Sequence, residues 1–431
     1  MAFDMIIKNG IIVTASEVYP RDLEIGIKNG KINCIGIDLQ SAEHTKIIDA
    51  EGAYITPGGV DSHVHLAQAN APTGDGFETG TRSSIAGGTT PIIAFATQDR
   101  KDDYCDYGFH LILANPTEQI LQNELLLLSR DEGITSVKIL MTYDALKLDD
   151  LLGITTMIHA ESHDIITLII EGLERHRNTE PFSFYSVARP RIAEDEASYR
   201  AISLAELSDA PILIVHMSSD VAVSHVRDAQ TRLLPIHAET CPHYLFLLSD
   251  KLCGEAQDHF CGAKHVSSPP LRHDPRDLEN LWKGIVNGTF TTWSSDHAPS
   301  KYNVPHGKRR MALLFDQTPA CKPRENARLS LPRFVQLTST NAAKLYGLGY
   351  CKGTIAPGYD ADLVIWYPSR TGSCKISNSM LHHDVDYTPF EGMEVGNWPR
   401  YTILRGQLVW DKAKDITGKL GYGQFLKRNK G

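Results

Sequence analysis

Histidines, an aspartate and one lysine recur near the ends of apolar runs in the middle of the chain. His63 and His65 lie two residues apart in Gly59-Val-Asp-Ser-His-Val-His65. On a strand, this spacing points both rings to one face. A His-x-His pair alone is a weak signal, because solvated or hydrogen-bonded histidines share the pattern. The signal strengthens because other apolar runs end in the same way, with His159, His216 and Asp296.

Lys138 lies inside the apolar run Thr135-Ser-Val-Lys-Ile-Leu-Met141. A buried lysine is costly unless it is paired or chemically altered, although a lysine at a strand edge can extend its amine to solvent. A neutral amine can add CO₂ to become a carbamate, and that anion could bridge two metal ions. Imidazole and carboxylate suit Zn²⁺. Two such ions, about 3.5–4 Å apart, can share a hydroxide at neutral pH. The set therefore predicts a two-zinc hydrolytic centre.

The elements that must position these residues are eight short apolar runs separated by crossovers. Eight is the strand count of a (β/α)8 TIM barrel, whose active sites lie at the C-terminal ends of the strands. The predicted strands are 55–65, 91–97, 107–114, 136–142, 155–160, 212–217, 233–238 and 291–295, and helices are predicted over 78–87, 195–208, 219–232 and 330–346.

Both ends of the chain read as strands joined by tight turns. Asn9-Gly10 and Asn29-Gly30 each lie between β-branched runs, which is a strong hairpin signal. A similar pattern of apolar runs and turn residues returns after Gly353. We therefore predict a small β-sandwich domain from residues 1–54 and 351–431, the latter with a C-terminal tail, and the barrel over 55–350.

Composition excludes several classes of function. The net charge of −9 argues against nucleic acid or an anionic membrane as the main partner. No apolar run approaches the roughly 20 residues that a membrane helix needs. The eight cysteines form no Cys-x-x-Cys pair, and the N-terminus has no signal-peptide pattern. We therefore expect free thiols and a cytoplasmic protein.

The motifs together resemble those of the dihydropyrimidinase and hydantoinase group of the amidohydrolase superfamily, and fungal-type dihydropyrimidinases most of all. The likeness runs nearly end to end. The stretches that carry it are Thr56–His65, Phe77–Thr90, Val137–Tyr143, His159–Glu161, Val215–Ser219, Ala238–His243, Ser267–Arg272, Ser294–His297, Gly353–Leu363 and Phe390–Glu394.

This resemblance implies a role for each residue. His63, His65 and Asp296 would hold one zinc ion, His159 and His216 the other, and carboxylated Lys138 would bridge both. Tyr143 would hydrogen-bond the oxyanion, the backbone of Ser268 would hold the ring imide, and Asp296 would carry the proton. The substrate would be a small cyclic amide or imide. 5,6-Dihydrouracil, a substrate of pyrimidine degradation, would give N-carbamoyl-β-alanine. The resemblance also implies a homotetramer.

The chain departs from this family in three segments that look shortened, near residues 98–106, 143–154 and 303–310. The first two links are short for parallel crossovers, which usually need a dozen residues or more. In the third, His306 stands about where the family has a substrate-binding asparagine.

Other readings stay open. One is a hydantoinase acting on 5-substituted hydantoins. Another is a non-catalytic dihydropyrimidinase-related scaffold, although such proteins have typically lost metal ligands. Among nearby residues, we expect a structural role for His237-Ala-Glu239 and a hydrogen bond rather than a metal bond for His297. Asp61 could orient the His63 and His65 pair or serve as a turn residue.

Overall fold

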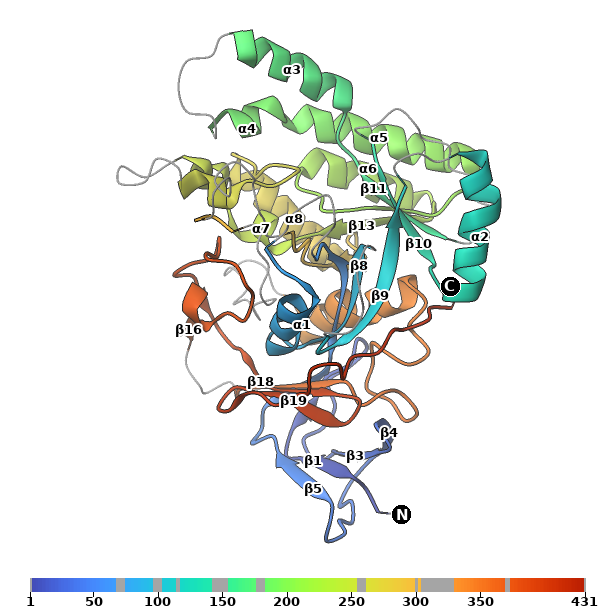
Figure 1. Ribbon diagram of the computed structural model, residues 1–431, viewed down its shortest axis with the longest axis vertical. Helices are drawn as coiled ribbons and strands as arrows, with labels where there is room; N and C mark the ends of the chain where they lie inside the picture. The colour runs from blue at the N-terminus through green and yellow to red at the C-terminus, as the bar shows by residue number, and fades with distance from the viewer. Residues whose placement is uncertain are drawn as a thin grey trace.

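The computed structural model describes residues 2–66, 74–95, 103–113, 117–141, 154–175, 183–253, 261–298, 301–303, 329–368 and 373–429. A barrel lies above a β-sandwich made from both ends of the chain (Figure 1). No helix among these residues is long and apolar enough to cross a membrane.

The barrel is a parallel sheet of eight strands in chain order, and its last strand returns to its first. Val64 forms a parallel bridge with His297, and the His65 amide donates to the His297 carbonyl at 2.6 Å, which closes the ring. The predicted (β/α)8 fold is therefore confirmed. Its strands are β7 (Gly59–Val64), β8 (Thr89–Phe95), β9 (Asp106–Ile112), β10 (Ser136–Leu140), β11 (Thr155–His159), β12 (Ile212–Ile214), β13 (Ile236–Thr240) and β14 (Thr292–Trp293).

The predicted strand over 55–65 is in fact two strands. β6 (Tyr54–Pro57) pairs with β15 (Leu363–Trp366) in the sandwich, and only β7 enters the barrel. The break falls at Gly58, where an added Cβ would lie 2.1 Å from the Thr90 hydroxyl oxygen. Only glycine fits this close approach between the two sheets.

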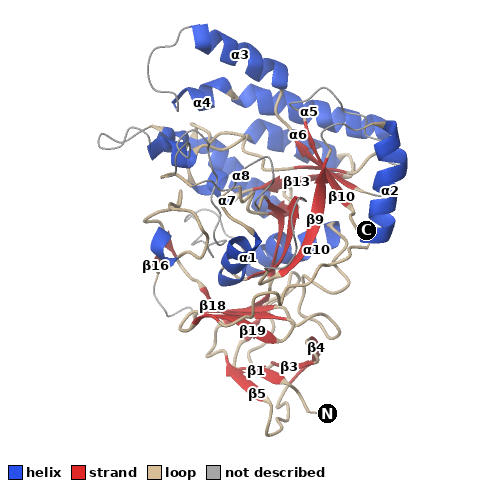
Figure 2. Ribbon diagram, viewed as in Figure 1, coloured by secondary structure: helices blue, strands red, loops and turns tan. Residues whose placement is uncertain are grey.

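Helices surround the barrel, as Figure 2 shows. The four predicted helices are present, the last with a π-helical turn at its centre. The structure adds helices that the sequence analysis did not predict. The helices are α1 (Phe77–Ala86), α2 (Leu125–Leu127) between the π-helical turns Ile120–Glu124 and Leu128–Glu132, α3 (His163–Arg175), α4 (Ser183–Ala188), α5 (Arg191–Ser208), α6 (Asp220–Thr231), α7 (Pro242–Phe246), α8 (Pro275–Asn287), α9 (Leu331–Val335) with the π-helical turn Gln336–Thr340, and α10 (Asn341–Leu345).

The sandwich packs a four-stranded sheet against a six-stranded one around isoleucine-rich contacts. The first sheet contains β4 (Lys31–Gly36), β3 (Glu24–Lys28), β1 (Met5–Lys8) and β5 (Lys46–Asp49). The second contains β2 (Ile11–Ile12), β6, β15, β18 (Pro399–Leu404), β19 (Gln407–Asp411) and β20 (Asp415–Ile416), and β16 (Cys374–Lys375) pairs separately with β17 (Glu394–Val395). Strands from the two chain ends thus share one sheet, as predicted for the sandwich.

The two Asn-Gly turns have different outcomes. Asn29 and Gly30 adopt φ of 51° and 74° and join the antiparallel strands β3 and β4, so this hairpin is confirmed. The hairpin predicted at Asn9-Gly10 is wrong, because β1 and β2 lie in different sheets. There the turn carries the chain across the sandwich, since β2 finds its partner in β6.

The short link after β8 does not prevent parallel pairing, because β8 and β9 pair in parallel from Pro91 and Asp106 onward. The described part of that link, residues 103–105, contains no helix. Instead, residues 419–429, which we call the C-terminal strap, run along β9 (Figure 1). Its backbone exchanges hydrogen bonds of 3.0 and 2.8 Å with Tyr107, and Phe425 packs beside that ring. The strap therefore covers apolar surface of β9.

Candidate metal centre

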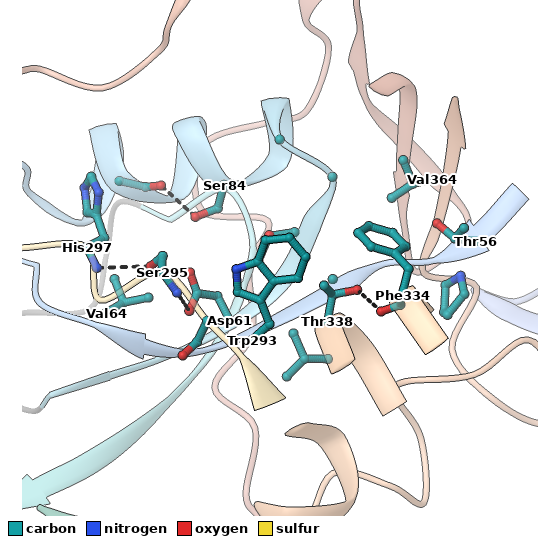
Figure 3. A pocket seen from close by; sticks show the side chains of 18 of the residues that line it. Thr56, Asp61, Val64, Ser84, Trp293, Ser295, His297, Phe334, Thr338 and Val364 are labelled. Atoms are coloured by element: carbon teal, nitrogen blue, oxygen red, sulfur yellow. Dashed lines mark hydrogen bonds between the residues drawn. The ribbon is translucent and has the colours of Figure 1, made fainter. Parts of the chain in front are cut away.

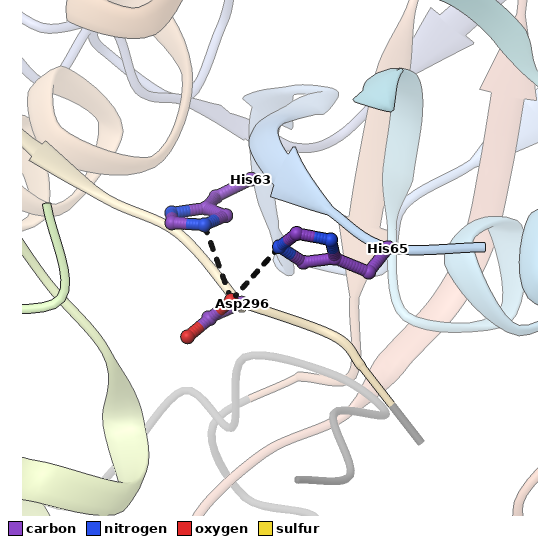
Figure 4. A group of neighbouring side chains, drawn as sticks. All are labelled: His63, His65 and Asp296. Atoms are coloured by element: carbon purple, nitrogen blue, oxygen red, sulfur yellow. Dashed lines mark ion pairs between the residues drawn. The ribbon is translucent and has the colours of Figure 1, made fainter. Parts of the chain in front are cut away.

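Three of the predicted ligands converge at one point above the barrel. His63 lies near the end of β7, His65 follows that strand, and Asp296 follows β14 (Figure 4). The Oδ1 atom of Asp296 lies 3.1 Å from Nε2 of His63 and 3.5 Å from Nε2 of His65. One ligand atom from each residue lies within 4.8 Å of the other two. Such a cluster of two imidazoles and a carboxylate suits a divalent cation.

The other three predicted ligands lie beside this cluster. Lys138 Nζ on β10 is 3.2 Å from His63 Nε2. The rings of His159 and His216 lie 4.5 Å apart between centroids, and the His216 ring is 5.6 Å from that of His63. All six residues line a cavity of about 270 Å³, together with Ser268. The structure thus brings together all six ligand-capable residues and one predicted substrate contact.

Buried carboxylates orient the rings from behind. Glu239 Oε1 accepts from His63 Nδ1 at 2.5 Å, and Glu161 Oε2 accepts from His159 Nε2 at 2.8 Å. These bonds leave Nε2 of His63 and Nδ1 of His159 as the available ligand atoms. Arg189 also pairs with Glu161. Burial raises the pKa of Glu161, but the hydrogen bond with His159 and the charge of Arg189 together hold that pKa below its usual value. Each ring is therefore fixed in one tautomer by a partner outside the cluster.

Asp61 fixes the backbone around the same ligands. Its carboxylate accepts from the His63 amide at 3.1 Å and from the Ser295 amide at 3.2 Å. It therefore joins the end of β7 to the loop that carries Asp296. Asp61, Ser295 and His297 line a second cavity, where Figure 3 shows Ser295 between the other two. Asp61 thus acts through backbone positions, which supports the first of the two roles open to it.

Burial sets the charge states in the site. It lowers the pKa of Lys138 to about 8, although the carboxylates of Asp296 and Glu239 oppose this shift. A lysine with such a pKa has a sizeable neutral fraction near neutral pH, which addition of CO₂ requires. Burial also raises the pKa of Asp296, opposed by the charge on Lys138. Without a bound cation, burial therefore disfavours the charged form of Asp296.

The loops that follow β12 and β14 hold two ligand-capable residues in unfavourable backbone conformations. His216 has φ of 42° and Asp296 has φ of 54°, both in the left-handed region that non-glycine residues rarely adopt. Such conformations persist where the surrounding structure determines them, and they concentrate at functional sites. Here they turn both side chains into the cavity.

The donor set fits a pair of zinc-like ions. Four imidazoles line the cavity, together with one carboxylate and one amine. Nδ1 of His216 has no hydrogen-bond partner among the described residues, although it is buried. Imidazole and carboxylate are the borderline ligands that Zn²⁺ accepts. Nothing in the described part of the cavity conflicts with two such ions.

The substrate contacts are placed only in part. Ser268 lines the cavity, and its hydroxyl lies 2.5 Å from the Tyr185 hydroxyl on α4. Tyr143 and His306 lie outside the described residues. Tyr185 also lines the cavity, and the sequence analysis did not identify it.

Three residues near the site had been assigned roles outside the ligand set, and one of them contacts a predicted ligand. His297 Nε2 lies 2.9 Å from the Asp75 carboxylate, so this histidine is hydrogen-bonded as expected. His237 lines a different cavity, with Nδ1 3.1 Å from the Thr291 hydroxyl. Glu239, expected to be structural, instead contacts His63. The only feature of the sequence that could have indicated this contact is a carboxylate inside a strand that carries no predicted ligand.

Comparisons with known proteins agree with this geometry. The Amidohydrolase family model matches residues 54–409. A D-hydantoinase of Ralstonia pickettii is 37% identical, with 99% of both chains covered. That alignment spans 467 positions, more than the 431 residues of this chain, so the relative has segments without a counterpart here. A D-phenylhydantoinase of Escherichia coli is 32% identical over 98% of both chains.

Solved structures give the same answer for the fold. A D-hydantoinase structure superimposes with a TM-score of 0.90 at 35% identity, covering 99% of both chains. The dihydropyrimidinase of Brevibacillus agri gives 0.90 at 34% identity, again over 99% of both chains. With the family model and these full-length likenesses, the chain belongs to the amidohydrolase family, within its hydantoinase and dihydropyrimidinase group of cyclic amidohydrolases.

Proposed function

We propose that this enzyme uses two zinc ions to hydrolyse the ring amide of 5,6-dihydropyrimidines, opening dihydrouracil to N-carbamoyl-β-alanine. The observation that carries the proposal is the convergence of six ligand-capable side chains in one cavity. The cavity, of about 270 Å³, is near the lower end of ligand-pocket sizes and suits a small ring. A non-catalytic scaffold has no need of this complete set.

The ligand roles follow the family pattern. His63, His65 and Asp296 would hold one ion, and His159 and His216 the other. Lys138, as a carbamate, would bridge them, since its lowered pKa favours the neutral amine that reacts with CO₂. When bound, the two ions would supply a hydroxide at neutral pH and polarise the ring carbonyl.

The protein residues would handle the proton and the orientation of the substrate. Asp296 would accept the proton of the attacking water and deliver it to the departing ring nitrogen, as a general base and then a general acid. Its carboxylate lies within hydrogen-bond reach of the His63 ring, at the centre of the cluster. Ser268 would hold the imide through its backbone, and Tyr143 would donate to the oxyanion.

A second candidate substrate class is 5-substituted hydantoins. The names of the relatives favour it, because those at 37% and 32% identity are a D-hydantoinase and a D-phenylhydantoinase. Both classes contain the same ring imide beside a hydrolysable amide. The proposed chemistry is identical for both, and only the walls of the cavity would distinguish them.

The deciding experiment compares the two substrates directly. Protein expressed with zinc and bicarbonate is assayed for ring opening of dihydrouracil and of hydantoin with a 5-substituent. A higher kcat/KM for dihydrouracil than for the hydantoin supports the main proposal. A higher kcat/KM for the hydantoin would instead make this enzyme a hydantoinase. Turnover of neither by folded, metal-loaded protein would contradict both. By resemblance we also propose a homotetramer, which light scattering after gel filtration tests. From the cysteine pattern and the N-terminal sequence we propose a cytoplasmic location, which fractionation of the source cells tests.

A further inference from the structure

The C-terminal strap carries a buried arginine near its end. Arg428 is only 3% exposed, and its Nη1 donates to the Ser136 hydroxyl at 2.7 Å. Its Nη2 donates to the Phe109 carbonyl. Neither of these partners is a carboxylate, and burial lowers the pKa of Arg428 to about 10. Burying a cation on neutral partners is costly, so its position calls for a role beyond covering apolar surface.

A chain of hydrogen bonds leads from this arginine to the strands of the metal centre. The Ser136 hydroxyl lies 2.5 Å from Nδ1 of His110, and Nε2 of His110 lies 2.9 Å from the Ser62 carbonyl. A carbonyl only accepts, so Nε2 carries the hydrogen and Nδ1 accepts from Ser136. The hydrogen bonds of this series are therefore all donated in the same sense, from Arg428 through Ser136 and His110 to the Ser62 carbonyl.

The two ends of this chain adjoin predicted ligands. Ser62 precedes His63 on β7, and Ser136 lies two residues before Lys138 on β10. Residues two apart on a strand face the same side. His110, on β9, stands between these strands with no exposed surface. Its ring therefore links the Ser62 carbonyl of β7 to the Ser136 hydroxyl of β10.

We propose that Arg428 is a positioning residue for the metal centre, acting through Ser136 and His110 on the strands that carry His63 and Lys138. This inference rests on the metal centre of the proposed function, but not on the identity of the substrate.

The surroundings of the strap are shaped to hold it in this place. Gly133 and Gly347 have φ of 70° and 74°. A Cβ on Gly133 would lie 2.6 Å from the Arg428 amide nitrogen, and one on Gly347 would lie 1.8 Å from the Asn429 carbonyl oxygen. Only glycine allows this approach at both positions. The final residues of the strap are thus seated against the barrel rather than lying loosely on it.

The first test measures metal affinity rather than activity. Metal-free full-length Arg428→Ala is titrated with zinc against a chelating dye, after circular dichroism has confirmed its fold. We expect an affinity about tenfold to a hundredfold weaker than that of the wild type, the range seen when partners behind metal ligands are removed. Lys427→Ala is the matched control, because the neighbouring lysine is exposed and donates to the Asp131 carbonyl. It should keep the wild-type affinity.

A second test separates positioning from simple covering of the barrel. Low-millimolar guanidinium should restore zinc affinity in Arg428→Ala, because it can occupy the vacated site and donate to Ser136. It should not restore affinity in the double variant Arg428→Ala/Ser136→Ala, which lacks the acceptor. Ser136→Ala alone should also weaken zinc binding. This variant tests the inference independently if Arg428→Ala does not fold. Wild-type affinity in folded Arg428→Ala, or in Ser136→Ala, would overturn the inference.

The proposed function and this inference can fail separately. A wild-type protein that binds zinc but opens neither dihydrouracil nor hydantoin contradicts the function alone. A wild-type protein that turns over substrate, with an Arg428→Ala variant of equal zinc affinity, contradicts the inference alone.

Discussion

The Glu239 carboxylate lies 2.5 Å from Nδ1 of His63, and both side chains are completely buried. Glu239 belongs to β13, which provides none of the six proposed ligands, while His63 lies near the end of β7. A carboxylate behind an imidazole fixes its tautomer and makes its other nitrogen a better ligand. A strand that provides no proposed ligand thus helps to orient a proposed ligand on another strand.

Replacing Glu239 tests this arrangement. Burial raises the pKa of Glu239 to about 8, and Glu239→Gln keeps a hydrogen-bond acceptor but can never become a carboxylate behind His63. Zinc affinity should therefore fall about tenfold to a hundredfold while the fold is retained. Dye competition measures the change. Asp277→Asn is the control, since Asp277 is also buried but pairs with Arg191 at 3.2 Å and touches none of the six proposed ligands. Unchanged zinc affinity in Glu239→Gln would show that His63 needs no such partner.

Lys138→Ala tests the bridging carbamate. The variant should lose zinc and activity, because no other described group occupies the place between the two halves of the site. Acetate or another small carboxylic acid should restore part of both by standing in for the carbamate, and neutral acetamide should not. Metal content and ring-opening rates are measured with each additive. Full activity in the untreated variant would refute the bridging role.

Tyr185→Phe tests the wall of the cavity. The Tyr185 hydroxyl bonds to that of Ser268, so its loss should loosen the proposed imide contact rather than the metal centre. One hydrogen bond contributes about 1 kcal/mol, so KM should rise about fivefold while kcat changes little. Steady-state kinetics separate the two constants. Tyr199→Phe, on the exposed face of α5, is the control. A fall in kcat at constant KM would contradict this assignment.

His243 predicts how stability depends on pH. Burial lowers its pKa to about 3, and neither ring nitrogen has a hydrogen-bond partner among the described residues. The unfolded chain, with a pKa of about 6.5, binds a proton that the folded chain does not, so stability falls as pH decreases from about 6.5 to 3. Between pH 7 and 5 this histidine should remove about 2 kcal/mol.

His243→Leu should abolish that contribution. Urea unfolding of the metal-free protein at both pH values gives the comparison. The wild type should lose about 2 kcal/mol more than the variant on going to pH 5. An equal loss in both proteins would mean that His243 titrates normally in the folded state.

The barrel could be predicted because most of its strands overlap short apolar runs and each proposed ligand lies in or just after one of its strands. The break at Gly58 could not, since it depends on contact with Thr90 on the next strand. The α8 helix was predictable and was missed. Asp274 accepts from the Arg276 amide at its start, Pro275 follows, and Gly288 ends it with φ of 92°. These are ordinary start and stop signals.

The residues behind the ligands were beyond the reach of the sequence for a different reason. Glu239 meets His63 across 176 positions of the chain, and Arg428 meets Ser136 across 292. No local period or spacing relates such pairs, because the closure of the barrel brings the first together and the docking of the strap brings the second together. Asn9-Gly10 failed in the same way, since the partner of β2 lies far along the chain in β6.

The central claim is that bound metal in this cavity opens a ring amide. The most direct test strips the purified protein of metal, reloads it with zinc in bicarbonate, and follows ring opening of dihydrouracil and a 5-substituted hydantoin while bound zinc is counted in the same samples. We expect no turnover without metal and a rate that rises with zinc to two equivalents per chain. Equal turnover by the stripped protein, or none by a chain holding two zinc ions, would contradict the account.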